Sequence, residues 1–403
     1  MMDENKYILC DKNNCCGCGA CVEVCHQNAI KLLEDKYGFV YPSIDETKCI
    51  KCGMCKIMCS YQNDISKKNP IKTFVAKTNE EYIINSASGG IFSNIASNFI
   101  LDGGIVYGCS MEFENSISKV KHIRIEDINK ICELQGSKYV QSSMDGIYKR
   151  IKEDLINEKK VLFSGTPCQV AAVINYTKNI KKGKLYTIDL ICHGVPNQKM
   201  FNDYILVLKN KKKYNEINNF KFRDKTYKEG MNASVSYKNK FNENKISIIN
   251  SHFSSYYQLF LKSEIYRENC YSCKYAGKER MGDLTLGDFW GLFDVHSELK
   301  NNKKFGNDKG ISCIICNSSN GFELINRYIS NCELYDSTID KVAKHNKQLE
   351  RASIKGKDRE KILSMYLKSG YTSVEKWYNI KYCFKNTIYY IFKIIPNRWK
   401  NKK

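Results

Sequence analysis

The chain lacks any long run of apolar residues. No segment approaches the roughly 18 consecutive apolar residues that a membrane-spanning helix needs, and the mean hydropathy is -0.47. The first residues, MMDENKYILC, also lack the basic and then apolar pattern of an export signal. A polytopic membrane protein and an exported protein are both disfavoured, so we expect a cytoplasmic protein without a transmembrane segment.

Dense basic patches are missing as well, although the chain as a whole is strongly basic. Lysine and arginine number 64 against 43 aspartates and glutamates, which gives a formal net charge of +21. The lysines are scattered, apart from short runs such as Lys211 to Lys213. Because a nucleic-acid interface needs basic and aromatic residues gathered on one face, we expect no nucleic-acid partner. The charge is better explained by a solvated surface that attracts acidic partners or substrates.

Aromatic residues and cysteine are what the chain has in abundance. An apolar fraction of 42%, with 27 tyrosines and 18 phenylalanines, excludes a disordered chain. Its 403 residues suffice for two or three domains. Disulfides are rare in the reducing cytosol, so the 20 cysteines favour metal ligation or catalysis.

Two four-cysteine runs with the spacing C-x2-C-x2-C-x3-C lie near the N-terminus. In such runs the first three thiolates bind one 4Fe-4S cluster and the fourth reaches the other cluster. A structural zinc site would accept isolated C-x2-C pairs but not two matched runs. We therefore predict a bacterial-type ferredoxin domain of the α+β ferredoxin-like class over residues 1–66. Its first cluster is assigned to Cys15, Cys18, Cys21 and Cys59, and its second to Cys49, Cys52, Cys55 and Cys25.

The two runs depart from the usual pattern in two respects. The residue after each fourth cysteine is usually proline, but here it is His26 or Ser60. Cys16 stands beside Cys15 as a rival ligand, and the spacing to Cys18 favours Cys15. Cys10 lies outside both runs and is interpreted as a packing residue.

A polar stretch from Asn63 to Pro70 precedes a change to alternating apolar strands and periodic helices, which predicts an α/β domain with a mixed or parallel sheet. Apolar residues from Ile91 to Ile100 recur at helical spacing behind Ser88-Gly89-Gly90. The amides of such a turn can bind an anion such as a flavin pyrophosphate. A capped helix with a close-packed glycine pair explains the same turn more simply.

The segment Val161 to Gly194 has the pattern of a βαβ unit in which a cysteine follows each of the two strands. Thr166 and Pro167 predict the start of its helix, which places Cys168 where the helix dipole stabilises a thiolate. Cys192 follows the next strand directly. Because parallel strands present their carboxyl ends at one edge of the sheet, we expect the two cysteines to be neighbours.

Cys270 and Cys273 form a C-x2-C pair on a polar segment, so four cysteines are available for a third site. Cys313 and Cys316 share this spacing but lie on a predicted strand, where positions three apart face opposite sides. We expect that second pair to be core residues. The remaining cysteines are interpreted as packing residues: Cys109, Cys132, Cys332 and Cys383.

Six segments together resemble the coenzyme F-420 hydrogenase/dehydrogenase beta-subunit family, and the resemblance extends to about residue 330. These segments are, in order, SASGGIFSNIA, LQGSKYVQS, VLFSGTPCQVAA, IDLICHGVPN, NCYSCKYA and GDLTLGDFWG. The resemblance implies a flavoprotein that holds FAD beside an iron-sulfur cluster. It places the flavin against Ser88, Gly89 and Gly90 and against Gly136, Ser137, Lys138 and Tyr139. It places a third 4Fe-4S cluster on Cys168, Cys192, Cys270 and Cys273.

The resemblance also divides the remaining chain into three regions. Residues 70–158 would form the flavin side of the beta-subunit domain, and residues 159–335 its C-terminal part with the third cysteine set. Residues 336–403 would form a basic helical tail. The aromatic and lysine-rich segment from Ile380 to Ile395 is interpreted as a packing helix, with contact to a membrane surface or a partner protein as the alternative.

Clusters carry single electrons and a flavin converts them to two-electron chemistry. We therefore predict an oxidoreductase that passes electrons between 4Fe-4S clusters, FAD and an organic two-electron substrate or deazaflavin-like acceptor. A redox partner protein or small electron carrier would exchange electrons with the clusters. His193 is a candidate proton donor, and a structural hydrogen-bonded histidine is the alternative. The alternative function is a non-catalytic electron-delivery subunit for a partner enzyme, with surface-polysaccharide biosynthesis as a family association.

Overall fold

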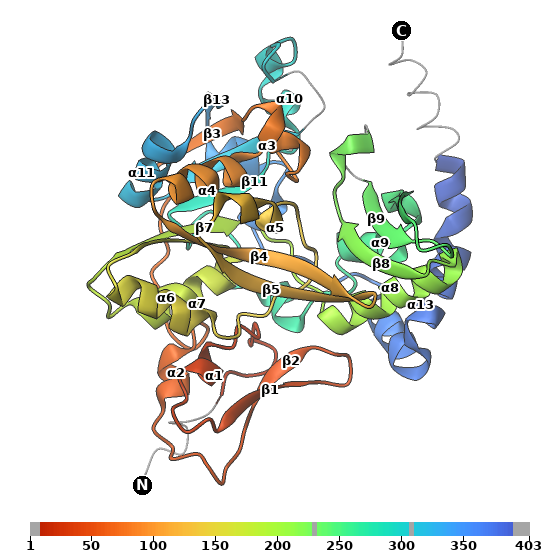
Figure 1. Cartoon of the computed structure of the whole chain (residues 1–403), viewed down its shortest axis with the longest axis horizontal. Helices are drawn as coiled ribbons and strands as arrows, with labels where there is room; N and C mark the ends of the chain where they lie inside the picture. The colour runs from red at the N-terminus through yellow and green to blue at the C-terminus, as the bar shows by residue number, and fades with distance from the viewer. Residues whose placement is uncertain (1–8, 228–231, 306–309, 390–403) are drawn as a thin grey trace.

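The computed structural model describes residues 9–227, 232–305 and 310–389. These residues form an N-terminal module, a central sheet domain and a second lobe (Figure 1). The N-terminal module lies below helices α6 and α7 of the sheet domain, and the second lobe lies beside the sheet. None of the helices within the described residues combines the length and apolar character needed to cross a membrane.

The N-terminal module repeats one local structure, in which a glycine begins a short helix that carries cysteine. Gly19 has φ of 81° and Gly53 has φ of 77°, values that strain any residue with a β carbon. The two cysteine runs thus share the same left-handed glycine conformation before their short helices. A ferredoxin-like fold for the module stays a prediction. Its elements are α1 (Ala20–Glu23), β1 (Ile30–Glu34), β2 (Val40–Ile44) and α2 (Met54–Met58), with β1 and β2 antiparallel.

The central sheet has eight strands in the order β13-β3-β12-β11-β7-β6-β4-β5. Neighbours among β11, β7, β6 and β4 are parallel, and the outer pairs are antiparallel. The prediction of an α/β domain with a mixed or parallel sheet is therefore confirmed in its mixed form. The strands are β3 (Lys72–Lys77), β4 (Ile105–Glu114), β5 (Ile117–Ile125), β6 (Lys160–Gly165), β7 (Lys184–Leu190), β11 (Leu284–Asp288), β12 (Ser312–Cys316) and β13 (Glu333–Ser337).

Alternation along the strands divides the apolar core between the two faces of this sheet. Val106 packs in a cluster with helices α4 and α11, whereas Tyr107 packs in a second cluster with α6 and α7. Cys313 and Cys316 are fully buried and belong to different clusters, as expected for strand positions three apart. The helices are α3 (Glu80–Ile84), α4 (Ile91–Leu101), α5 (Ile131–Leu134), α6 (Ile147–Ile156), α7 (Pro167–Thr177), α10 (Leu292–Val295), α11 (Ser319–Tyr328) and α12 (Ile339–Ala343).

The predicted βαβ unit is present as β6, α7 and β7. Strands β6 and β7 are parallel, with Lys160 opposite Lys184. The amide of Thr166 donates to Gln169 Oε1 at 3.0 Å, and Pro167 occupies the first turn, so the sequence signals for the helix start act as expected. This start places Cys168 at the sheet edge where β6 and β7 end.

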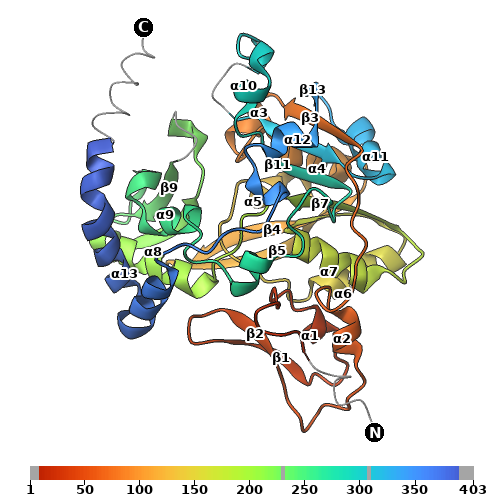
Figure 2. The ribbon, with the colours of Figure 1, turned by 180° about the vertical axis from the view of Figure 1, so that it is seen from behind.

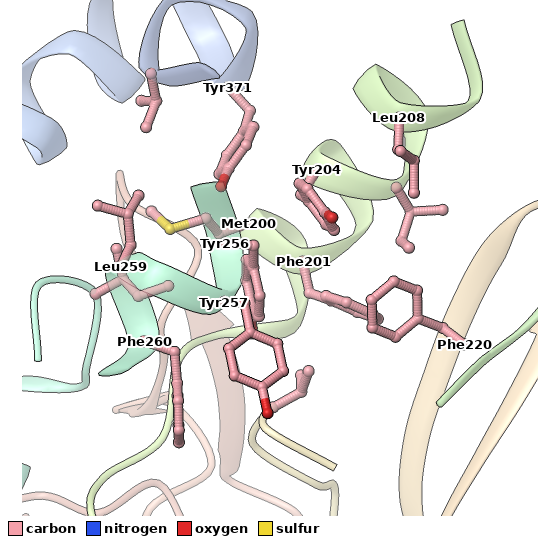
Figure 3. Close-up of a cluster of buried hydrophobic side chains, with 14 of the residues drawn as sticks. Met200, Phe201, Tyr204, Leu208, Phe220, Tyr256, Tyr257, Leu259, Phe260 and Tyr371 are labelled. Atoms are coloured by element: carbon pink, nitrogen blue, oxygen red, sulfur yellow. The ribbon is translucent and has the colours of Figure 1, made fainter. Parts of the chain in front are cut away.

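The second lobe packs a three-stranded sheet against three helices around an aromatic core (Figure 3). The rings of Phe201 and Tyr256 lie 5.0 Å apart, and those of Tyr204 and Tyr256 lie 5.4 Å apart. Such ring pairs stabilise the core beyond their area of burial. The elements are α8 (Gln198–Lys212), β8 (Glu216–Lys221), β9 (Ala233–Lys238), β10 (Asn244–Ile249), α9 (Ser255–Leu261) and α13 (Arg359–Tyr389). Short 3-10 helices at 128–130, 225–227, 251–253, 268–272, 297–299 and 347–349 complete the described elements.

Helix α13 forms the outer edge of the second lobe (Figure 2). Its backbone is interrupted at Ser369 and Gly370. Beyond the interruption Val374 and Tyr378 are buried, whereas Ile380 is exposed. The helix therefore packs on the lobe as a terminal helix. The predicted tail segment continues past residue 389 and so lies partly outside the described residues, and membrane contact by the tail stays a prediction.

Truncation of a core ring tests the second lobe. Because Phe201 is fully buried among aromatic rings, Phe201→Ala should lower the free energy of unfolding by about 3 to 5 kcal/mol. Leu206→Ala on the same helix is the control, since Leu206 is exposed, and it should change stability by less than about 0.5 kcal/mol. Chemical denaturation without air measures both. Equal effects would contradict this description of the core.

Candidate metal centres

The four cysteines assigned to the first cluster lie around one cavity. Cys15, Cys18, Cys21 and Cys59 line about 430 Å³ of empty space. Cys59 comes from the second run, so the structure brings the predicted crossed set together. Cys55 of the second set lines the same cavity. Their ligation of a cluster stays a prediction.

Local contacts shape this cavity. The amide of Gly17 donates to Cys15 Sγ at 3.4 Å, as an amide does toward a ligand sulfur. Cys10 also lines the cavity and is hydrogen-bonded to Cys59, which lowers the pKa of Cys59 to about 6. Sequence spacing gave Cys10 no role, because it belongs to neither run. Burial raises the pKa of Cys15 and Cys21, and metal binding must displace their protons.

The second cysteine set lies nearer the surface. Cys52 is exposed, whereas Cys25 and Cys49 are half-buried and Cys55 is buried. Burial raises the pKa of Cys55, and the charges of Cys52 and Cys49 raise it further, which places these three thiols close together. Cys25 Sγ accepts a hydrogen bond from the amide of Ala29 at 3.4 Å. A cluster held here would be the one most accessible to an external electron carrier.

The third cysteine set also lies around one cavity. Cys168 from the start of α7, Cys192 from the loop after β7, and Cys270 and Cys273 from the 3-10 helix at 268–272 and its end line about 490 Å³ of empty space. The parallel arrangement of β6 and β7 brings the first two together, as the sheet-edge argument predicts. The C-x2-C pair, about a hundred residues further along the chain, closes the same space.

Hydrogen bonds hold the thiols of this third set. Thr166 Oγ1 lies 3.1 Å from Cys168 Sγ, and Tyr61 Oη lies 3.6 Å from Cys273 Sγ. A hydrogen bond with Cys16 and then one with Thr166 lower the pKa of Cys168 to about 7. Burial raises the pKa of Cys192 and Cys270. Tyr61 belongs to the N-terminal module and lines the first cavity, so that module directly contacts a cysteine of the third set.

Cys16 forms part of the wall of both cavities. Its thiol interacts with the thiol of Cys168 on one side and with that of Cys18 on the other, and both interactions raise the pKa of Cys16. The predicted first and third sites are therefore separated by a single side chain. Sequence spacing treated Cys16 only as a rival to Cys15, because its contact with Cys168 spans about 150 residues of sequence.

The residues present fit iron-sulfur clusters. Within the described part of the chain, no three His, Cys, Asp or Glu side chains converge as they would on a single metal ion. A cubane needs a wider space, since each thiolate binds a different iron at a corner of the cluster. Four cysteines around one cavity are the donor set that such a cluster takes, and the 19 cysteines from Cys10 to Cys332 are free of disulfides.

The two segments predicted to line a flavin lie close together. Gln135, just before Gly136, donates through Nε2 to Ser93 Oγ at 3.2 Å on helix α4, whose start follows Gly90. Several predicted groups are engaged within the protein. The amide of Gly89 donates to Ser312 Oγ at 2.9 Å, and Ser88 Oγ donates to the carbonyl of Ile311 at 2.9 Å.

The second of these segments is also engaged. Lys138 Nζ donates to the carbonyl of Gln135 at 2.8 Å, and the Tyr139 ring stacks on Phe260 at 4.2 Å. The Ser137 side chain is hydrogen-bonded to Tyr139. The structure thus places both segments in one region and gives each a structural role. Flavin binding by them stays a prediction.

His193 lines the third cavity and retains solvent exposure. The protein packed around its ring lowers its pKa, and the charge of Asp288 opposes that shift. A lowered pKa favours the neutral ring at pH 7, which is able to accept a proton. Its role as a proton donor stays a prediction.

Comparison with known proteins agrees with this arrangement. Residues 14–63 match the 4Fe-4S dicluster domain, a range that contains both four-cysteine runs. Residues 158–342 match the C-terminal domain of the coenzyme F420 hydrogenase/dehydrogenase beta subunit, and this range contains the third cysteine set. Residues 158–342 therefore form a domain of the type found in that beta-subunit family. The resemblance inferred from the sequence motifs is thus confirmed.

Two further proteins are similar to this chain. An uncharacterized protein of Methanocaldococcus jannaschii is 29% identical over 206 residues, which cover 42% of this chain and 54% of that relative. The chain therefore spans about half the length of that curated relative. A chain in the structure of the F420-reducing [NiFe] hydrogenase complex from Methanosarcina barkeri is 13% identical. The match covers 75% of this chain and 94% of that chain, with a TM-score of 0.44.

Iron content tests the third set. If three four-iron clusters are held, the protein purified without air should contain about twelve irons per chain. The double variant Cys168→Ala with Cys192→Ala should contain about eight, because only the third cluster loses ligands. Cys313→Ala is the matched control, since Cys313 is a core residue, and it should retain about twelve. Equal iron in all three proteins would contradict a third cluster on these cysteines.

Proposed function

We propose that this protein is an iron-sulfur flavoprotein oxidoreductase. It would pass electrons between 4Fe-4S clusters, FAD and an organic two-electron substrate or deazaflavin-like acceptor. The observation that carries the proposal is the position of Cys16 in the wall of two cysteine-lined cavities. Electron transfer from the N-terminal module into the beta-subunit domain requires that the cluster sites of the two lie this close together.

The chain's own residues set the order of this route. Cys52 is exposed, whereas Cys16, which lines both the first and the third cavity, is buried. Tyr61 and Tyr275 reinforce the junction. Their rings meet edge to face at 5.2 Å, and Tyr275 Oη donates to the carbonyl of Ser60 at 2.7 Å. A flavin, when bound, supplies the conversion between one-electron and two-electron transfer.

Positive charge beside the predicted flavin segments supports an anionic cofactor there. Lys225 Nζ donates to the carbonyls of Ser88 and Ile83. Burial lowers the pKa of Lys225 to about 7, and the charge of Arg223 contributes to the lowering. An anionic group such as a pyrophosphate would favour the charged form of this lysine. We assign this region to FAD on that basis and on the match to the beta-subunit family.

Flavin content tests the assignment. Acid extraction of the protein purified without air should release one flavin per chain, and its fluorescence should rise after phosphodiesterase treatment, which identifies FAD. Lys225→Met should lower flavin retention, because it removes the cation beside Ser88. Lys240→Met is the control, since Lys240 is an exposed lysine of the turn between β9 and β10. A loaded iron-sulfur protein without any flavin would contradict this function.

The exposed edge of the second cysteine set is suited to electron exchange with a protein partner, on which the other candidate function, an electron-delivery subunit, also depends. Ile50 is 66% exposed and Ile57 is 46% exposed, on either side of Cys52 in sequence. Apolar side chains beside an exposed cluster ligand are suited to brief docking of a one-electron carrier. This docking serves an electron-delivery subunit and an oxidoreductase equally.

The docking face formed by Ile50 and Ile57 beside Cys52 is tested by comparing two electron donors. Ile50→Ser combined with Ile57→Ser should lower the rate of reduction by a reduced bacterial ferredoxin several-fold, because contact area is lost. Reduction by methyl viologen should not change, since that small molecule needs no docking face. Ile117→Ser on β5, whose side chain is similarly exposed, is the control. An unchanged ferredoxin rate in the double variant would exclude this face.

A further inference from the structure

Arg267 is a fully buried cation at the junction of the N-terminal module and the beta-subunit domain. Its relative exposure is 0%. Its amide donates to the carbonyl of Val195 at 2.9 Å, and its carbonyl accepts from the amide of Cys270 at 3.0 Å. The backbone of Arg267 thus begins the segment that carries Cys270 and Cys273. Its side chain extends to the other cysteine-lined cavity.

The hydrogen-bond partners of the Arg267 guanidinium are neutral. Nε donates to the carbonyl of Cys15 at 2.8 Å, one terminal nitrogen donates to Gln141 Oε1 at 3.1 Å, and the other donates to the carbonyl of Val40. The guanidinium also lies 4.2 Å from the ring centre of Tyr41. These hydrogen bonds use three of the five N–H donors of the guanidinium and leave its charge unneutralised.

No carboxylate among the described residues forms an ion pair with Arg267. The adjacent Glu268 is paired with Lys355 and Arg359 instead. A buried cation without an anion is strongly disfavoured in a protein interior. An anion near Arg267 would offset the cost of burying its charge, and the thiolates that metal binding produces at the neighbouring cysteine sets are the available anions.

The charge of Arg267 acts on both neighbouring cavities. It opposes the burial that raises the pKa of Cys15, and it does the same, more weakly, for Cys270. Contact with the first set is direct. A β carbon at Gly17, between Cys15 and Cys18, would lie 2.8 Å from Arg267 Cζ. The guanidinium therefore packs against the loop that supplies three of the four thiolates of the first set.

We propose that Arg267 is the counter-charge of the first cluster and raises its reduction potential. Reduction adds one electron to a centre that four thiolates already make negative, so a fixed positive charge stabilises the reduced form more than the oxidised form. The third cluster feels the same charge more weakly, through Cys270. The proposal rests on ligation by the first cysteine set and requires neither FAD nor a substrate.

Redox titration of the full chain, purified without air and followed by electron spin resonance, tests the proposal. Arg267→Gln should shift the midpoint potential of the first cluster to more negative values and shift that of the third cluster less. Arg267→Lys should retain most of the potential because it keeps the charge. The signals of the second cluster, identified with Cys52→Ser, should not move. Unchanged midpoints in a loaded Arg267→Gln protein would overturn the proposal.

A second pair of variants decides the question if Arg267→Gln does not retain its iron. Gln141→Glu keeps Arg267 but places a carboxylate at the position of its hydrogen-bond acceptor, which neutralises the charge, whereas Gln141→Met removes the same amide without adding charge. The first should lower the midpoint potential of the first cluster and the second should not. Equal midpoints in the two variants would overturn the proposal. Fewer than eight irons in the unmodified protein would instead show failure of the cluster assignment itself.

Discussion

The packing of the first cysteine loop against the edge where β6 and β7 end is the interaction on which the rest of the structure depends. It brings Cys16 to Cys168, Tyr61 to Cys273 and Arg267 to Cys15. Each contact joins the N-terminal module to the beta-subunit domain. Without this packing the two cysteine-lined cavities would belong to separate bodies, and no short route between them would exist.

The topology of the central sheet explains why the first cysteine loop packs at this edge. Parallel strands β6 and β7 end at one edge, and the helix after β6 begins with the thiol of Cys168. The same edge receives the C-x2-C pair through the backbone bond between Arg267 and Val195. The open edge of an α/β sheet is the usual position of a binding site. Here the N-terminal module covers that edge rather than leaving it to solvent.

Sequence patterns predicted the features that depend on local spacing. The cysteine runs, the start of helix α7 and the opposite faces of Cys313 and Cys316 follow from intervals of a few residues, and the structure contains the helix start and the split between faces as expected. The parallel-strand rule also brought Cys168 and Cys192 to one edge. These predictions needed no knowledge of distant contacts.

The features that sequence reasoning missed depend on contacts across long stretches of chain. Cys10 beside Cys59, Cys16 beside Cys168 and Arg267 beside Cys15 carry no spacing signal. The second lobe was missed for another reason. Its strands are short and mostly polar, as in β8, and its core comes from aromatic residues on several helices. A buried arginine near a cysteine pair was visible in the sequence only as one basic residue among many.

The place of β3 in the central sheet has a consequence for biosynthesis. This strand lies between β12 and β13, although more than 230 residues of chain separate it from either neighbour. The sheet is incomplete until residues near 337 have left the ribosome. The eight cysteines of the two four-cysteine runs lie close together in sequence and are available much earlier. Iron acquisition by the N-terminal module is therefore expected to precede closure of the third site, so the order of the chain sets an order of maturation.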